Sequence, residues 1–250
     1  MLRFFRKMRN ALIPDSRFGR YFFYALGEIV LVVIGILIAL QVNNWNEDRK
    51  NLIGAEKQLL TLKQNISDDI KQIVRLDKEM DTLIFYSKIL MEQFKTNIPI
   101  NYNTPYYIFY LILEHHFNPN RSGLNTITNE GLMAYIDEDI KNNILNYYEL
   151  LEQINSREQI SNSIIHTFLE PYLIDNYSEI FNKNNPFPHF KEIYANDPRI
   201  PEPLDNEKLL SDKKLENLIT NRLYQSRKQK ELYTQSLGLA NEILTQINKQ

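Results

Sequence analysis

Residues 21–42 read YFFYALGEIVLVVIGILIALQV, with no strongly polar side chain apart from Glu28 and Gln41. About 20 apolar residues are needed to cross the hydrocarbon core of a bilayer. A helix that is apolar on every face over this length needs lipid around it, or else a very large protein core. A cleavable signal peptide is the alternative, but its apolar region usually spans only about 7–15 residues, and no A-x-A site follows here. The stretch therefore predicts an uncleaved signal anchor that crosses the membrane once.

The charge on the two flanks predicts the orientation of this helix. Residues 1–20 carry a net charge of +5, from six basic residues and Asp15, whereas residues 41–50 are neutral. The more positive flank stays in the cytoplasm. We therefore expect residues 1–20 to be a basic cytoplasmic segment, residues 21–42 to span a bacterial inner membrane, and residues 43–250 to form a periplasmic domain. The six basic residues are Arg3, Arg6, Lys7, Arg9, Arg17 and Arg20.

The predicted span carries candidate residues for contact with lipid and with a second helix. Arg20, Tyr21 and Trp45 lie where membrane-interface anchors are expected. Glu28, Gly35 and Ala39 recur at helical spacing, and Gly35-x-x-x-Ala39 is a pair of small residues that lets two backbones approach closely. An ionisable group at the depth of Glu28 is costly unless it is paired, protonated or extended to the headgroups. Two interpretations stay open for this stripe, namely a helix–helix contact and a Glu28 side chain that snorkels toward the cytoplasmic headgroups.

The same region carries a family resemblance. The sequence GEIVLVVIGILIALQVNNWNE at 27–47 follows a short basic N-terminus with FFRK at 4–7. These motifs resemble an uncharacterised family of small single-pass membrane proteins of Bacteroidota, domain of unknown function 6090. Weaker similarity lies around Ser122-Gly123 and Asn146-Tyr147-Tyr148. The resemblance implies one span and a helical domain across the whole chain, and it implies no activity.

From residue 51 onward the apolar pattern predicts an all-α fold, an exported bundle of long antiparallel helices with shorter helices. Eleven of fourteen a and d positions from Leu52 to Asn97 are apolar, which is typical of a coiled coil or a long bundle helix. Pro99 ends that helix, and Thr104-Pro105 begins the next. We expect further helices at 106–117, 124–132, 140–172 with a kink or the end of the regular part at Pro171, and 211–248, and a Pro-rich loop at 184–204. Phe168 lies on the apolar face expected for the helix 140–172, and Leu223, Leu237 and Leu244 lie on that of the last helix. Ser226 and Lys230 interrupt the apolar face of the last helix.

No motif of catalysis or of cofactor binding accompanies these helices. The chain has no Cys, which excludes disulfides, thiolate metal sites and a cysteine nucleophile. The phosphate-binding glycine motifs, the H-E-x-x-H zinc motif and the nucleophile elbow are absent. Beyond residue 40 the net charge is −6, which disfavours nucleic acids as partners. We therefore expect no enzyme activity, no cofactor and no nucleic-acid partner.

Two weaker site hypotheses remain. Glu114, His166 and Glu170 include an i,i+4 pair that could hold a metal, although we interpret these residues as ordinary polar side chains. The 15 Tyr and 13 Phe lie at helical spacing, which favours a core, and a tyrosine-lined pocket for a small ligand stays open. Three functions follow: a membrane-anchored interaction or scaffold module, which we favour; a ligand-sensing domain that signals through a partner protein; and an unrecognised periplasmic enzyme. The predicted partners of the protein are the lipid bilayer and either a second copy of the chain or another membrane protein.

Overall fold

A computed structural model describes residues 17–249, apart from the side chains of Arg17, Phe18 and Arg20. The chain divides into two compact units, Met1–Glu56 and Lys57–Gln250. The basic residues from Arg3 to Arg9, which set the predicted orientation, lie outside the described residues. Within the described part every regular element is a helix, so the predicted all-α fold is confirmed.

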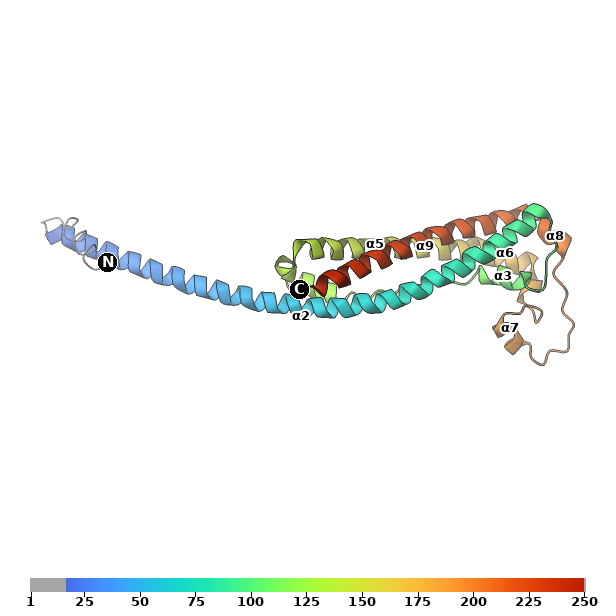
Figure 1. Cartoon of the computed structure of the whole chain (residues 1–250), viewed down its shortest axis with the longest axis horizontal. Coiled ribbons are helices and arrows are strands. Elements are labelled where there is room, and N and C mark those ends of the chain that lie inside the picture. Colours follow the sequence, from blue (N-terminus) through green and yellow to red (C-terminus); the bar gives the residue numbers. More distant parts are fainter. Residues whose placement is uncertain (1–16, 250) are drawn as a thin grey trace. The chain divides into compact units, whose positions relative to one another are not determined.

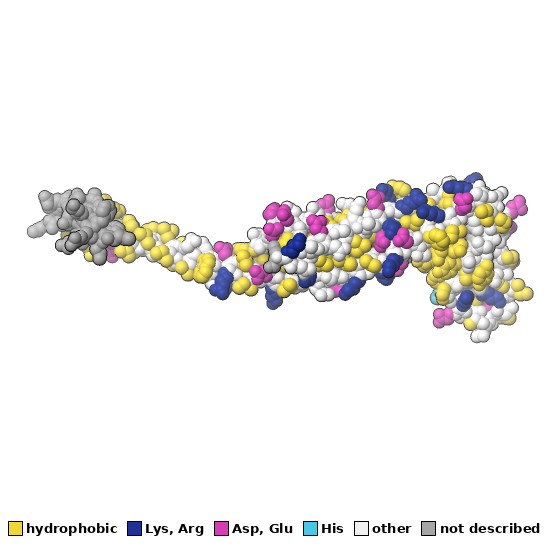
Figure 2. Space-filling view, viewed as in Figure 1, with side chains coloured by type: hydrophobic (Ala, Val, Ile, Leu, Met, Phe, Trp, Pro, Cys, Tyr) yellow, Lys and Arg dark blue, Asp and Glu magenta, His cyan; other side chains and the backbone are white. Residues whose placement is uncertain are grey.

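The apolar stretch lies in helix α2, Arg17–Thr96 (Figure 1). All side chains of residues 21–42 are exposed, and α2 is the one described helix that is long and apolar enough to cross a membrane. Hydrophobic side chains cover this stretch, whereas charges of both signs are scattered over the bundle (Figure 2). Helix α2 ends before Pro99, as predicted, and Asn97 follows it with a positive φ of 54°, the left-handed conformation common just beyond a helix.

From Ala55 onward, α2 buries the predicted heptad face. Of its fourteen a and d positions only Leu52 and Asn97 are exposed, so the two polar positions within the pattern, Asp69 and Ser87, are buried as well. The buried set is Ala55, Leu59, Leu62, Ile66, Asp69, Ile73, Leu76, Met80, Leu83, Ser87, Leu90 and Phe94.

The second unit is a bundle of α2, α5 (Glu138–Ile164) and α9 (Lys213–Ile247), which lie side by side in Figure 1. Asp137 and Asp212 cap α5 and α9 by accepting bonds from two backbone N–H groups each. Contacts pair Asn143 with Glu242 and Arg157 with Gln225, so α5 and α9 are antiparallel. Helices α2 and α9 are antiparallel as well, because contacts pair Asp77 with Lys230 and Met91 with Thr220.

Short helices connect these three. They are α3 (Thr104–Tyr110), α4 (Ser122–Asn129), the 3₁₀ helix η1 (Leu132–Tyr135), the π-helix η2 (Ile165–Leu169), α6 (Glu170–Asn176), the 3₁₀ helix η3 (Ser178–Phe181), α7 (Pro188–Ile193) and α8 (Asn206–Ser211). The predicted Pro-rich loop thus contains one short helix, α7. The irregularity expected at Pro171 is the π-helix before it. Proline lacks the N–H for an α-helical bond, and a π-turn accommodates the change of pattern.

One helix prediction was wrong. The apolar run 106–117 was expected to be one buried helix, but α3 ends at Tyr110 and residues 111–121 continue without helical structure. We call residues 111–121 the strap. Its residues 114–118 alternate between exposed and buried, the period of an extended chain. The bundle thus holds four chain segments, of which the second is extended.

Candidate functional site

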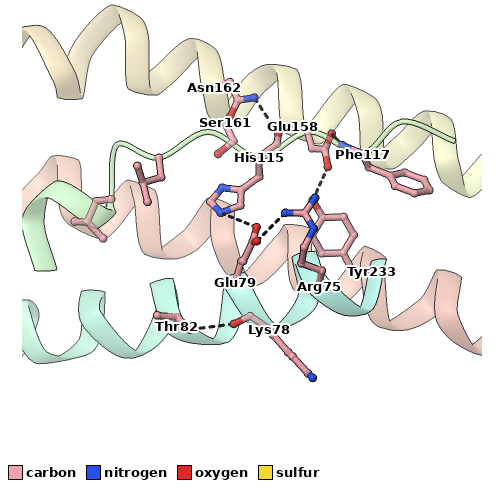
Figure 3. A network of polar contacts seen from close by, with 12 residues as sticks. Arg75, Lys78, Glu79, Thr82, His115, Phe117, Glu158, Ser161, Asn162 and Tyr233 are labelled. Atoms are coloured by element: carbon pink, nitrogen blue, oxygen red, sulfur yellow. Dashed lines mark hydrogen bonds and ion pairs between the residues drawn. The ribbon is translucent and has the colours of Figure 1, made fainter. Parts of the chain in front are cut away.

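The strap lies between the three long helices and runs antiparallel to α2. His115 contacts Glu79, and the Asn120 N–H bonds to Asp69. Ten residues of α-helix rise roughly 15 Å, and five extended residues rise roughly 16 Å, so the strap passes the helix at nearly full extension. An extended chain cannot satisfy its own backbone groups. The bundle supplies the missing partners from side chains, and this set of contacts is the candidate functional site (Figure 3).

Arg222 of α9 binds the start of the strap. Its Nε donates to the Leu111 carbonyl at 2.9 Å and its Nη2 to the Leu113 carbonyl at 3.1 Å, while Nη1 donates to the Ser161 hydroxyl of α5. Arg222 is only 1% exposed. Burial lowers the pKa of its guanidinium to about 10, so the group stays charged at neutral pH. One buried cation therefore joins α9, α5 and two strap carbonyls.

Helix α5 binds the middle of the strap. The Glu158 carboxylate accepts the Phe117 N–H at 2.9 Å and the Tyr233 hydroxyl of α9, and the Asn162 amide donates to the His115 carbonyl at 3.1 Å. Burial raises the pKa of Glu158 above its ordinary value. Its two donors favour the ionised form and oppose that shift. Figure 3 shows Glu158 and Asn162 reaching the strap from the same helix.

His115 points inward from the strap toward α2. Its Nε2 lies 3.5 Å from a Glu79 oxygen, and Arg75 donates to the other Glu79 oxygen at 2.8 Å. His115 is 4% exposed. Burial, and then the nearby charge of Arg222, lower the pKa of His115 to about 3. The imidazole is therefore neutral at physiological pH and acts as a buried polar contact.

Asp69 of α2 binds the end of the strap, and Asn65 of α2 binds the first turn of α4 just beyond it. Asp69 accepts the Asn120 N–H and the Tyr147 hydroxyl, each at 3.2 Å. Burial raises the pKa of Asp69 to about 6. Asn65 accepts the Gly123 N–H at 3.0 Å. A Cβ on Gly123 would lie 2.9 Å from the Leu62 backbone nitrogen, so the chain approaches α2 here as only glycine allows.

The outer side of the strap carries the residues that were considered for a metal. Glu114 contacts His116 through one oxygen and His166 through the other, both at 2.8 Å, and the Nδ1 of His166 lies 3.5 Å from Glu170. The hydrogen bond from His116 lowers the pKa of Glu114. The structure thus brings Glu114, His166 and Glu170 together in polar contacts, with His166 between the two carboxylates. Residues 17–249 contain no group of three or more such side chains arranged to hold a metal.

The predicted membrane-helix residues all lie on α2. Tyr21 is 80% exposed and Trp45 66%, while the side chain of Arg20 lies outside the described part. Glu28 lines a shallow hollow on the helix surface beside Ala25 and Val32. A Cβ on Gly35 would meet nothing within 4 Å, so the stripe of Glu28, Gly35 and Ala39 is open to lipid or to another helix.

The tyrosine-lined pocket has only a partial counterpart. An open cleft of about 320 Å³ lies between η3 and the Pro-rich segment, with Tyr194 and Phe181 in its wall. Charged side chains including Glu179, Lys183 and Arg199 complete the lining. Arg199 forms a bidentate ion pair with Asp197, from Nε to Oδ1 and from Nη2 to Oδ2, and lowers the pKa of Asp197 to about 2. The cleft is therefore mainly polar.

Sequence reasoning missed the buried polar residues Arg222, Glu158 and His115. A signal was present in the α9 seam, which recurs at alternating spacings of four and three and includes Arg222, Ser226, Gln229 and Ser236 among apolar residues. The apolar face predicted for α9 included Leu223, Leu237 and Leu244, which are half-buried. Asp69 and Ser87 in the α2 heptads gave a second signal, because polar residues at such positions must find buried partners.

Comparison with known proteins gives a match to a family model. No curated protein and no solved structure is similar to the chain at a significant level. The match covers residues 28–96, from Glu28 to the last residue of α2, and the downstream motifs at 122–123 and 146–148 lie outside it. Over residues 28–96 the chain matches the model of the Family of unknown function (DUF6090), which confirms the resemblance predicted from the motifs of residues 27–47.

Proposed function

We propose that this protein is a single-pass, membrane-anchored interaction module of the bacterial inner membrane, with its N-terminus in the cytoplasm and its bundle in the periplasm. The apolar stretch of α2 carries this proposal. None of the residues in its most apolar 18-residue window is buried by the rest of the chain. Such a helix costs much free energy in water and very little in lipid.

The interaction role rests on how the polar groups of the bundle are used. The buried charged side chains Arg222, Glu158 and Asp69 bind backbone groups of the strap, so they serve the fold. We assign no catalysis and no cofactor to them. Partners would contact the bundle surface, the α2 stripe of Glu28, Gly35 and Ala39, or both, and either a second copy or another membrane protein would fit that stripe.

Reporter fusions test the topology. An enzyme that is active only in the periplasm should be active when fused after Gln250 and silent when fused before Met1, because the +5 flank keeps the N-terminus in the cytoplasm. Placing four basic residues beyond Trp45, in place of Arg3, Arg6, Lys7 and Arg9, should produce mixed orientations. The reverse pattern in the unaltered chain would contradict the proposed orientation.

A ligand-sensing role is the second candidate, and the cleft beside η3 favours it. Its lining combines the rings of Phe181 and Tyr194 with charges of both signs, as a site for a small polar molecule would. Substitution of Tyr194 by Ala should abolish any thermal stabilisation by such a molecule, whereas Tyr224→Ala, at an exposed site on α9, should preserve it. Equal responses of both variants would argue against this cleft.

A further inference from the structure

His166 lies between two carboxylates. Its Nε2 is 2.8 Å from a Glu114 oxygen and its Nδ1 is 3.5 Å from a Glu170 oxygen. A neutral imidazole carries one N–H and one lone pair, whereas an imidazolium carries two N–H groups. The neutral ring therefore satisfies one carboxylate and turns a lone pair toward the other. Only the protonated ring can donate to both.

The three residues belong to three different segments. Glu114 is part of the strap, His166 belongs to the π-helix η2, and Glu170 begins α6. Within η2, Ile165 and Leu169 are buried while His166 is exposed, so the π-turn directs the imidazole outward to the strap. Such turns are frequent at functional positions. A contact at His166 therefore fastens the outer side of the strap, opposite the bonds from Arg222 and Asn162.

We propose that His166 is a proton-operated clamp, which ties the strap to the α5–η2–α6 segment when it is protonated and loosens it when it is neutral. Imidazole side chains as a class change charge between about pH 5 and 8. The clamp is reachable by solvent protons because the His166 side chain is 53% exposed.

Other charged groups face the same region, and their effects on the strap must be distinguished from the effect of His166. His116 binds the second oxygen of Glu114 at 2.8 Å, and α9 presents the permanently charged Arg222 to the strap. His115 stays neutral, because burial lowers its pKa to about 3. Glu158 of α5 and Asp69 of α2 have raised pKa values through burial, so they also take up protons on acidification. A variant of His166 itself is therefore required.

Hydrogen exchange of the full-length protein in lipid nanodiscs tests the clamp. Protection factors of the amides of residues 111–121, corrected for intrinsic rates, should rise about threefold between pH 7.5 and pH 5.5. That magnitude follows because exposed ion pairs shift equilibria by roughly 1.4- to 5-fold each. His166→Gln can still donate to Glu114 but takes up no proton, so the pH response of the strap should fall to the part contributed by the buried carboxyls of Glu158 and Asp69.

Two further variants sharpen the test. Glu170→Gln should reduce the response, because one carboxylate then remains beside the ring. His189→Gln, at an exposed histidine on α7, should keep the full response of the native protein. If His166→Gln responds to pH as the native protein does, the clamp is refuted and the response belongs to the buried carboxyls. The result is independent of the topology test, since it concerns only the bundle.

Discussion

Single buried side chains in this protein compensate for one irregular stretch of backbone. Asp69 is the clearest example. Its ionised carboxylate has no exposed surface and accepts hydrogen bonds from one backbone N–H and one phenol hydroxyl. Burial disfavours its charge, while these two donors favour it. In the sequence, Asp69 stood out only as a polar residue at a d position of the heptads. Its role could not be predicted locally, since its partners Asn120 and Tyr147 lie 51 and 78 residues away.

Asp69→Asn should stabilise the protein above pH 6. A carboxyl whose pKa rises from 3.8 to about 6 on folding lowers stability progressively across that range and fully above it. The amide mimics the neutral form, because its oxygen can accept the Asn120 N–H while its nitrogen donates to the Tyr147 oxygen. We expect a gain of about 1 kcal/mol at pH 8 and none near pH 4, measured by urea unfolding. The neighbouring Asp68→Asn should give no gain, since Lys71 lowers the pKa of Asp68; an equal gain there would refute the explanation.

The role of the stripe of Glu28, Gly35 and Ala39 as a helix–helix interface remains a prediction. Interhelical polar contacts in membranes contribute about 0.6 kcal/mol on average, so Glu28→Gln should weaken association only slightly. Gly35→Ile places bulk where the surface is open and should weaken it more. Cross-linking in membranes measures both, with Ile34→Leu on the opposite face as the control. If both variants cross-link like the native protein, the stripe is not an interface and Glu28 snorkels instead.

At the scale of elements, the regular helices were predictable from the sequence, whereas the extended strap and its bonds to the helices were not. The heptads of α2, the caps of α5 and α9 and the break at Pro171 follow from local spacing. The strap does not, because a run of apolar residues looks the same in a helix and in a buried extended chain. Phe168 illustrates a smaller miss: it was expected on the apolar face of the helix 140–172, but it lies in η2 and is 56% exposed, while Leu169 is buried. The π-turn contains one residue more than an α-helical turn, so the buried face moves by one position along the chain. A pattern based on 3.6 residues per turn does not predict this shift.

Arg222→Met should destabilise the bundle strongly. The change leaves the Leu111 and Leu113 carbonyls without their donors, and each buried unsatisfied group costs about 1–3 kcal/mol. We expect a total loss of about 3 kcal/mol, read as a lower urea midpoint by circular dichroism. Arg227→Met, at an exposed position of the same helix, should change stability by less than about 0.5 kcal/mol. Similar losses in the two variants would show that charge on α9, rather than the strap contact, matters.

For the whole molecule, the division at Glu56 predicts that the bundle folds without the apolar stretch. A fragment of residues 47–250 should be soluble, mainly helical and cooperative in unfolding, as measured by circular dichroism. A fragment of residues 97–250 should fail to fold, because it lacks the buried face of α2 that includes Leu62, Ile66 and Ile73. A spectrum dominated by strand in the longer fragment would contradict the fold.

Trp45 is the single tryptophan of the chain, and it lies at an exposed position on α2 outside the bundle unit. Its fluorescence is therefore an intrinsic optical probe of one segment. Transfer of the protein from detergent to lipid should shift the emission maximum to shorter wavelength, whereas urea unfolding of the bundle should leave it almost unchanged. Optical spectroscopy of the unlabelled protein can thus follow the lipid boundary separately from the fold, with tyrosine ellipticity reporting on the bundle.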